Sequence, residues 1–258
     1  MFGLKARRRR RLLATPLPPA WEAVLRDEVP LYGRLPAADQ AELRGLAQVF
    51  LAEKRFEGCG GLALDDRMRV VIAGQACLLL LHRDGGFFPR LQSVLVYPEA
   101  FVTNEELEEV DGIVGEDDGE RLGESWGQGA LVLSWQDVAL DLKAPDDGFN
   151  VVLHEFAHQI DEDLGLSDGT APFSGEEGAR WAEVWEGEYA KHAADVRRGK
   201  RTFVDEYGAD DPGEFFAVAT EHFFEEPRPL RARHPRLYEQ LRLFYRQDPA
   251  AWGGAGKG

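Results

Sequence analysis

Residues 149–161 read Phe-Asn-Val-Val-Leu-His-Glu-Phe-Ala-His-Gln-Ile-Asp and carry the most informative pattern in the chain. In an α-helix, residues four positions apart lie on one face, so His154 and His158 can direct their imidazoles at a single point. The apolar residues follow the i, i+3, i+4, i+7 spacing of a helix with one buried side: Leu153, Phe156, Ala157, Ile160 and Leu164. We therefore predict a core helix that presents two histidines.

The spacing His154-Glu155-x-x-His158 is the signature of zinc peptidases. Two imidazole nitrogens on one helical face fit one Zn²⁺ at about 2.0–2.1 Å. Glu155 follows the first histidine and is expected beside the metal rather than on it, where a carboxylate can accept a proton from metal-activated water. The alternative is a buried helix whose two histidines are satisfied by hydrogen bonds, because short motifs recur by chance.

The composition describes an ordinary globular protein of 258 residues, with 44% hydrophobic and 29% charged residues. The formal net charge of −16 argues against a surface that binds nucleic acid, because phosphate is repelled at long range. No apolar run approaches the length that crosses a membrane. Cys59 and Cys77 are too few for a disulfide framework, so we expect reduced thiols and a cytoplasmic protein.

The organisation along the chain indicates one domain, over residues 20–250, without a dividing linker. Arg7 to Arg11 form a basic run, and the prolines that follow, from Pro16 on, leave no room for the apolar stretch of a secretory signal. We expect residues 1–19 to be a disordered basic tail. The alternative is a tether to RNA, membrane or an acidic partner. Residues 251–258 are expected to be frayed.

Periodicity and composition predict the main elements. Residues 94–97 and 130–133 have the composition of strands, 56–61 that of a glycine-rich turn, and 104–124 that of an acidic surface loop. The helix predicted at residues 68–81 is expected to be buried. Gln75 and Cys77 on it are expected to pack in the core. Helices are predicted at 21–32, 37–50, 68–81, 135–142, 176–198 and 215–224, the last opened by Asp211 as N-cap and Pro212 as first helical residue. Residues 228–245 are predicted to form one or two closing helices.

A catalytic zinc site needs three protein ligands and one open position. The metzincin pattern requires Gly at 161 and His at 164, where this chain has Asp161 and Leu164, so that class is excluded. Three residues on one face of the helix after Asp211 remain as candidates: Glu214, Glu221 and His222. Spacing does not rank them, and Glu214 also occupies the N3 position of a capping box. His192 is a further candidate, although a histidine in a polar stretch is usually exposed.

Five blocks of the sequence resemble the Mlc titration factor A family of zinc peptidases, whose metal site is similar to that of anthrax lethal factor. They span most of residues 50–225, and the last two together are highly specific: KRFEGCGGL (54–62), MRVVIAGQACLLLL (68–81), LVLSWQDV (131–138), NVVLHEFAHQID (150–161) and YGADDPGEFFAVATEHFF (207–224). The resemblance implies a mainly helical α+β fold with a small sheet, a single zincin-like domain of the gluzincin type.

The resemblance also implies a site. In the family, the glutamate of the Asp-Pro-x-Glu-Phe block is the third zinc ligand, which corresponds to Glu214, and a tyrosine seven residues earlier lies near the zinc, which corresponds to Tyr207. The expected enzyme binds one Zn²⁺ per chain through His154, His158 and Glu214, with Glu155 as general base and Tyr207 stabilising the oxyanion.

Further expectations concern partners. Zincins commonly hold an extended peptide against an edge strand, so we expect either residues 94–97 or residues 130–133 to form the edge strand that binds the peptide. Asp161 is expected to hydrogen-bond one of the metal-binding histidines and so fix its tautomer. An aminopeptidase and an endopeptidase both fit. The competing hypothesis, drawn from the family's name, is a module that sequesters a transcriptional repressor of sugar-uptake genes, with structural zinc. Glu155 favours catalysis, because a purely structural site needs no base.

Overall fold

The computed structural model describes residues 2–83, 86–99 and 129–253 of the chain. The predicted acidic loop at 104–124 and residues 254–258 lie outside this part. The elements in chain order are α1 (Phe2–Leu13), α2 (Pro19–Glu28), α3 (Pro30–Arg34), α4 (Ala37–Glu53), β1 (Arg55–Gly58), α5 (Asp66–Leu78), β2 (Ser93–Tyr97), β3 (Ala130–Ser134), α8 (Trp135–Asp141), α9 (Val151–Leu164), α10 (Gly175–Arg197), η1 (Glu206–Ala209), α11 (Pro212–Glu225), α12 (Pro227–Arg233), α13 (Pro235–Tyr245) and η2 (Pro249–Ala251). The fold is mainly helical with one small sheet, as predicted.

The sheet has three parallel strands in the order β1-β2-β3. The glycine-rich turn predicted at residues 56–61 is a strand in its first half: β1 extends to Gly58, and the turn begins at Cys59. Among the described strands β2 is central, paired on one side through Arg55↔Ser93 and on the other through Ser93↔Ala130. The expectation of an edge strand is therefore wrong for residues 94–97, whereas β3 lies at an edge of the described sheet.

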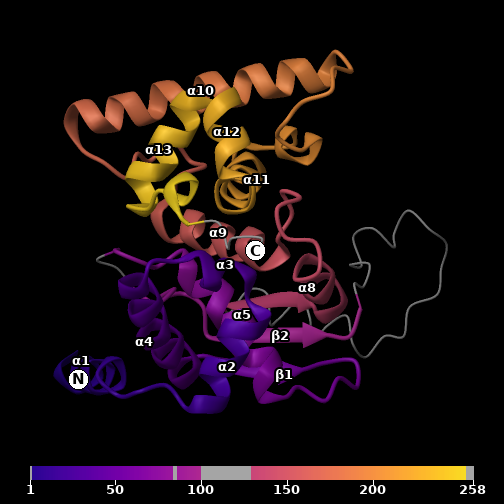
Figure 1. The fold of residues 1–258 in the computed structure, drawn as a ribbon. Coiled ribbons are helices and arrows are strands. Elements are labelled where there is room, and N and C mark those ends of the chain that lie inside the picture. Colours follow the sequence, from indigo (N-terminus) through magenta and orange to yellow (C-terminus); the bar gives the residue numbers. More distant parts are fainter. Residues whose placement is uncertain (1, 84–85, 100–128, 254–258) are drawn as a thin grey trace.

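Helix α9 lies in the middle of the molecule, between the C-terminal helices α10–α13 and the N-terminal helices with the sheet (Figure 1). It contacts α11, α5, α8 and β3. Its buried side packs Phe156 against Phe50 and Phe88, with ring centroids 5.6 Å and 4.8 Å apart. Leu164, predicted to be buried, is 38% exposed because it is the last residue of the helix, directly before Gly165 in the left-handed conformation. Such a central helix gives its polar residues a rigid support.

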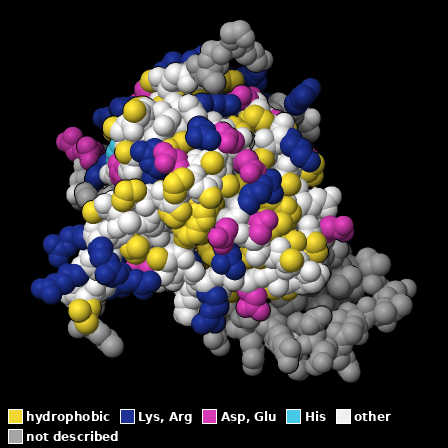
Figure 2. All heavy atoms as spheres, turned by 60° about the horizontal axis from the view of Figure 1, so that its bottom comes forward, with side chains coloured by type: hydrophobic (Ala, Val, Ile, Leu, Met, Phe, Trp, Pro, Cys, Tyr) yellow, Lys and Arg dark blue, Asp and Glu magenta, His cyan; other side chains and the backbone are white. Residues whose placement is uncertain are grey.

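The N-terminal segment is a helix rather than the predicted disordered tail. Helix α1 packs against α4, and the guanidinium of Arg9 donates two hydrogen bonds to Glu53, at 2.7 and 2.6 Å. Leu13 reaches within 3.1 Å of a Cβ built on Gly45 of α4. Figure 2 shows Lys and Arg side chains gathered at the edge of the molecule where α1 lies. The arginine run therefore has a partner on α4 that composition alone does not reveal.

None of the helices within the described ranges is long and apolar enough to cross a membrane.

Candidate metal centre

Three side-chain atoms from two helices converge on one point. The Nε2 atoms of His154 and His158 on α9 lie 3.2 Å apart. Oε2 of Glu214 on α11 lies 3.2 Å from the first nitrogen and 3.4 Å from the second. These residues form a group of His, Cys, Asp or Glu able to hold a metal ion within the described part of the chain. The structure thus brings together both predicted histidines and the predicted third ligand.

The spacing of the three atoms fits a divalent metal ion. Ligand atoms at about 2.0–2.2 Å from a tetrahedral zinc lie roughly 3.3–3.5 Å from one another, close to the observed 3.2–3.4 Å. Oε2 of Glu214 is buried, and no described donor makes a hydrogen bond with it. A buried, unsatisfied carboxylate oxygen facing two imidazole nitrogens is a donor set that suits a divalent metal ion.

Helix ends place these ligands. Asn150 caps α9 by accepting the backbone N–H of Leu153 at 3.0 Å. Asp211 caps α11 by accepting the N–H groups of Gly213 and Glu214, at 2.6 and 3.0 Å. Glu214 therefore stands in the first turn of α11, as predicted, but its carboxylate faces the histidines. Glycine at 213 permits a close approach, because a Cβ there would lie 3.3 Å from Oδ2 of Asp161.

Glu221 contacts His154 at Nδ1, the ring nitrogen that does not face the metal position. Its Oε1 lies 2.8 Å from Nδ1 of His154, and its Oε2 accepts the backbone N–H of Asn150 at 2.6 Å. A carboxylate at Nδ1 favours the tautomer with the proton on that nitrogen, which leaves the lone pair of Nε2 for a metal. Glu221 thus orients a metal-binding histidine, which is the role that we predicted for Asp161 from the sequence. That prediction is wrong, since Asp161 accepts the backbone N–H of Ser167 at 2.6 Å.

The ligand residues His154 and Glu214 shift one another's pKa values. Burial alone would lower the pKa of His154, but the nearby carboxylates of Glu214 and Glu221 raise that pKa to about 10. Burial opposes ionisation of Glu214, but the two histidines hold the pKa of its carboxyl at about 2. The site thus concentrates negative charge around the three ligand atoms, which favours a bound cation.

Glu155 follows the first ligand on α9. Burial raises the pKa of its carboxyl, against the opposing effect of His154 and His158, which favour the charged form. A general base works best when its pKa approaches the working pH, so this environment suits proton transfer.

Tyr207 lies on η1, beside the metal ligands. Its hydroxyl is 3.4 Å from Oε1 of Glu214, and its ring centroid is 6.0 Å from that of His154. Asp205 accepts the backbone N–H of Tyr207 at 3.0 Å and caps the short helix. Half of the Tyr207 side chain is exposed, which leaves it accessible to a substrate. Partial burial, followed by the charge of Glu214, raises the pKa of the phenol, so its proton is retained for donation.

Two further histidines are accounted for by other contacts. His192 is buried, contrary to the expected exposure, and its Nε2 lies 3.0 Å from the carbonyl oxygen of Asp205, at the start of the segment that carries Tyr207. His222 is buried with its Nδ1 3.2 Å from Oε2 of Glu226, away from the metal ligands.

A buried polar network beneath the site escaped the sequence analysis. The side-chain amide of Asn150 donates to Oε1 of Gln75 at 2.7 Å and to Oε1 of Glu225 at 2.9 Å. Gln75 is therefore a hydrogen-bond acceptor rather than a packing residue. Asn150, directly before the helix, carried the usual signal of an N-cap, but nothing in the sequence indicates its distant partners on α5 and α11.

Comparison with known proteins gives consistent matches. The family model of the glucose-regulated metallo-peptidase M90 matches residues 4–246. The chain is 40% identical to slr2042 of Synechocystis sp. over 94% of this chain and 89% of that protein. It is 34% identical to Mlc titration factor A of Salmonella arizonae, over 89% of this chain and 91% of the relative, and likewise 34% identical to that of Salmonella gallinarum, over 89% and 86%.

Proposed function

The chain belongs to the glucose-regulated metallo-peptidase M90 family, and we propose that it is a zinc-dependent enzyme that hydrolyses peptide bonds. The observation that carries the proposal is the convergence of His154 Nε2, His158 Nε2 and Glu214 Oε2 within 3.4 Å. The carboxyl of Glu155 is near enough to interact electrostatically with all three residues. A purely structural zinc site fills all four positions with protein ligands and needs no adjacent base.

His154, His158 and Glu214 would hold one Zn²⁺ per chain. Bound there, the ion supplies Lewis acidity, which polarises a carbonyl and lowers the pKa of water. Glu221 orients His154 through its Nδ1, and the first-turn position of Glu214 is fixed by the Asp211 cap.

Glu155 is assigned the proton transfers. Its carboxylate accepts a proton from the attacking water and later delivers it to the nitrogen of the departing amine, so one residue serves as base and then as acid. Its partly buried environment raises the carboxyl pKa, which makes the carboxylate a stronger base and so eases the first transfer.

Tyr207 is assigned to the oxyanion. Its hydroxyl lies near Glu214 and remains half exposed, so it is placed to donate a hydrogen bond to the carbonyl oxygen of a substrate as negative charge develops there.

A peptide or protein is the substrate class that the family supports. Strand β3 lies at an edge of the described sheet and contacts α9, so we expect an extended peptide to bind along it. Aminopeptidase and endopeptidase activity both fit this arrangement. We place the protein in the cytoplasm, since its two cysteines, Cys59 and Cys77, are both free.

A second candidate function is the binding of a transcriptional regulator. The printed name of the Salmonella relatives, Mlc titration factor A, supports it at 34% identity. We propose that such binding, where present, coexists with peptide hydrolysis, because Glu155 has no purpose in a passive metal site.

The decisive experiment replaces Glu155 by Gln. This change preserves the shape of the side chain and removes the base, so bound zinc should remain near one per chain while hydrolysis of a peptide panel falls by about 10²–10⁴-fold. Glu162→Gln is the matched control, because Glu162 is exposed on the same helix. Undiminished hydrolysis in Glu155→Gln, or activity that survives a strong chelator, would refute the proposed mechanism.

A further inference from the structure

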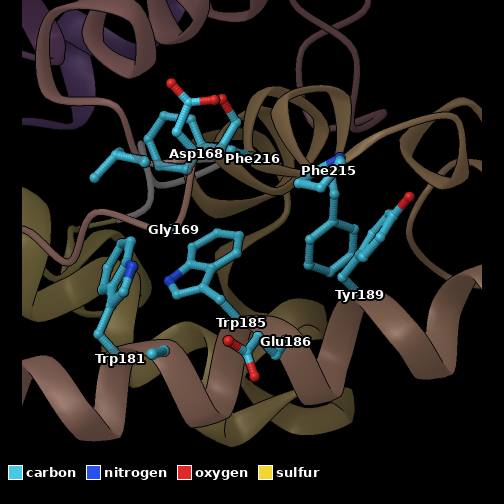
Figure 3. Close-up of a pocket in the computed structure, with 12 residues that line it drawn as sticks. Asp168, Gly169, Trp181, Trp185, Glu186, Tyr189, Phe215 and Phe216 are labelled. Atoms are coloured by element: carbon cyan, nitrogen blue, oxygen red, sulfur yellow. The ribbon is translucent and has the colours of Figure 1, made fainter.

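A cavity lies on the C-terminal half of the molecule. It has a volume of about 290 Å³ and is bordered by the loop after α9, by α10 and by the first turns of α11. Five of its lining residues are aromatic: Trp181, Trp185, Tyr189, Phe215 and Phe216. Figure 3 shows these rings arranged around it. On α11, Pro212, Phe215 and Phe216 face this cavity, while Glu214 faces the histidines. The cavity is therefore separate from the metal centre.

The indole N–H of Trp185 points to a ligand that carries a hydrogen-bond acceptor. Nε1 of Trp185 is buried and has no hydrogen-bond partner among the described residues. Figure 3 shows this nitrogen turned toward the side of the cavity where Trp181 lies. A buried donor left unpaired is energetically unfavourable, so an acceptor brought in by a ligand is favoured there.

Both charged residues of the lining are carboxylates. Figure 3 shows Asp168 and Glu186 on opposite sides of the aromatic group. Neither has an ion pair among the described contacts, and both are exposed. A ligand whose apolar body fills the cavity thus meets negative charge at the rim, which selects a positive group beside that body.

We propose that this cavity binds a short protein segment in which a bulky apolar side chain is adjacent to lysine or arginine. The apolar side chain fills the aromatic cavity, a backbone carbonyl accepts the indole N–H of Trp185, and the basic side chain reaches Asp168 or Glu186. A peptide brings all three features together, and a volume of about 290 Å³ suits one large side chain. The proposal does not depend on peptide hydrolysis.

The test is a titration followed by NMR of the indole N–H signals, with Trp185→Phe used to assign that of Trp185. The probe is the blocked tetrapeptide acetyl-Gly-Phe-Lys-Gly-amide. It should move the Trp185 signal downfield, because the N–H gains an acceptor. Replacing Phe by Ala or Lys by Glu in the peptide should weaken binding at least tenfold. An unmoved Trp185 signal, or equal binding of the three peptides, would overturn the proposal.

Protein variants locate the basic side chain. Glu186→Gln should weaken binding of the lysine peptide several-fold and bring its affinity closer to that of the Lys-to-Glu peptide. Glu183→Gln is the matched control, since Glu183 is exposed on the same helix, outside the cavity, where it pairs with Arg236. Equal effects of the two variants would mean that only the overall charge matters, and the assigned rim contact would be wrong.

Discussion

Oε1 of Glu221 lies 2.8 Å from Nδ1 of His154, while Oε2 of Glu214 lies 3.2 Å from Nε2 of the same ring. Two carboxylates of α11 thus face the two nitrogens of one histidine. One nitrogen is held by a hydrogen bond, and the other is left to the metal position. This relationship separates a metal ligand from a residue that orients a ligand, and it leads to different expected effects of replacing them.

The first prediction compares Glu214→Ala with Glu221→Ala. Glu214→Ala removes one of three ligands and should abolish retention of zinc through purification. Glu221→Ala leaves all three ligands in place, so zinc affinity should fall by only about 10–100-fold. Metal content after dialysis against a graded chelator series measures both. A greater loss for Glu221→Ala than for Glu214→Ala would reverse the assignment of the third ligand.

The second prediction concerns Tyr207→Phe, which removes only the hydroxyl that lies 3.4 Å from Glu214. Half of the side chain is exposed, so packing and zinc content should hardly change. Loss of one oxyanion donor costs about 2.7–4 kcal/mol, or roughly 10²–10³ in kcat. KM should move little, because the contact strengthens in the transition state. Steady-state kinetics and a melting curve decide: a lower Tm with kcat intact would make Tyr207 a structural residue.

Glu214 and Glu221 of α11 also show how much of the site can be predicted from the sequence. Residues seven apart lie on one face of a helix, so spacing correctly brought Glu214 and Glu221 to the side that faces α9. They stand about 10 Å apart along the axis, and only the packing of α11 on α9 determines which of them meets Nε2. The resemblance to a known family ranked them, whereas spacing did not.

Long-range contacts explain the other differences. Helix periodicity identified α9, α10 and α11, and cap residues located the start of α11. The basic run of α1 gave no such signal, because its order depends on Glu53, which lies 44 residues after Arg9. Strand β1 was missed for a similar reason: it is short, and its strand conformation depends on pairing with β2, far along the chain.

The third prediction concerns Gly148, in the turn that leads into α9. Its φ is +91°, and a Cβ there would lie 2.6 Å from Cε1 of the buried His222. Gly148→Ala should therefore destabilise the fold by about 1–3 kcal/mol in denaturant unfolding. Gly187→Ala is the control: Gly187 lies in helix α10 with no atom near the added methyl, so stability should rise by about 0.5–1 kcal/mol. Equal effects would mean that the turn relaxes freely.

The last prediction concerns the pH dependence that Glu225 gives to stability. Its Oε1 accepts the amide of Asn150 and its Oε2 the backbone N–H of Asp146, at 2.9 and 3.0 Å. Burial dominates these contacts and raises the carboxyl pKa from 4.5 to about 7. The folded chain therefore binds this proton more tightly than the unfolded chain. The resulting stabilisation is fully present below about pH 4.5 and is lost as the pH rises through about 7.

Glu225→Gln removes this titration while keeping one acceptor for Asn150. The free energy of unfolding of the wild type should fall between pH 5 and pH 8, by an amount of which Glu225 supplies on the order of 3 kcal/mol. The variant should lose that much less over the same interval, and any constant cost of the substitution cancels in the comparison. Urea unfolding at the two pH values measures both differences. Asp141, whose pKa burial raises to about 6, contributes equally to both proteins and leaves the comparison intact. Identical losses for wild type and variant would show that Glu225 is ionised throughout, held charged by its two hydrogen bonds.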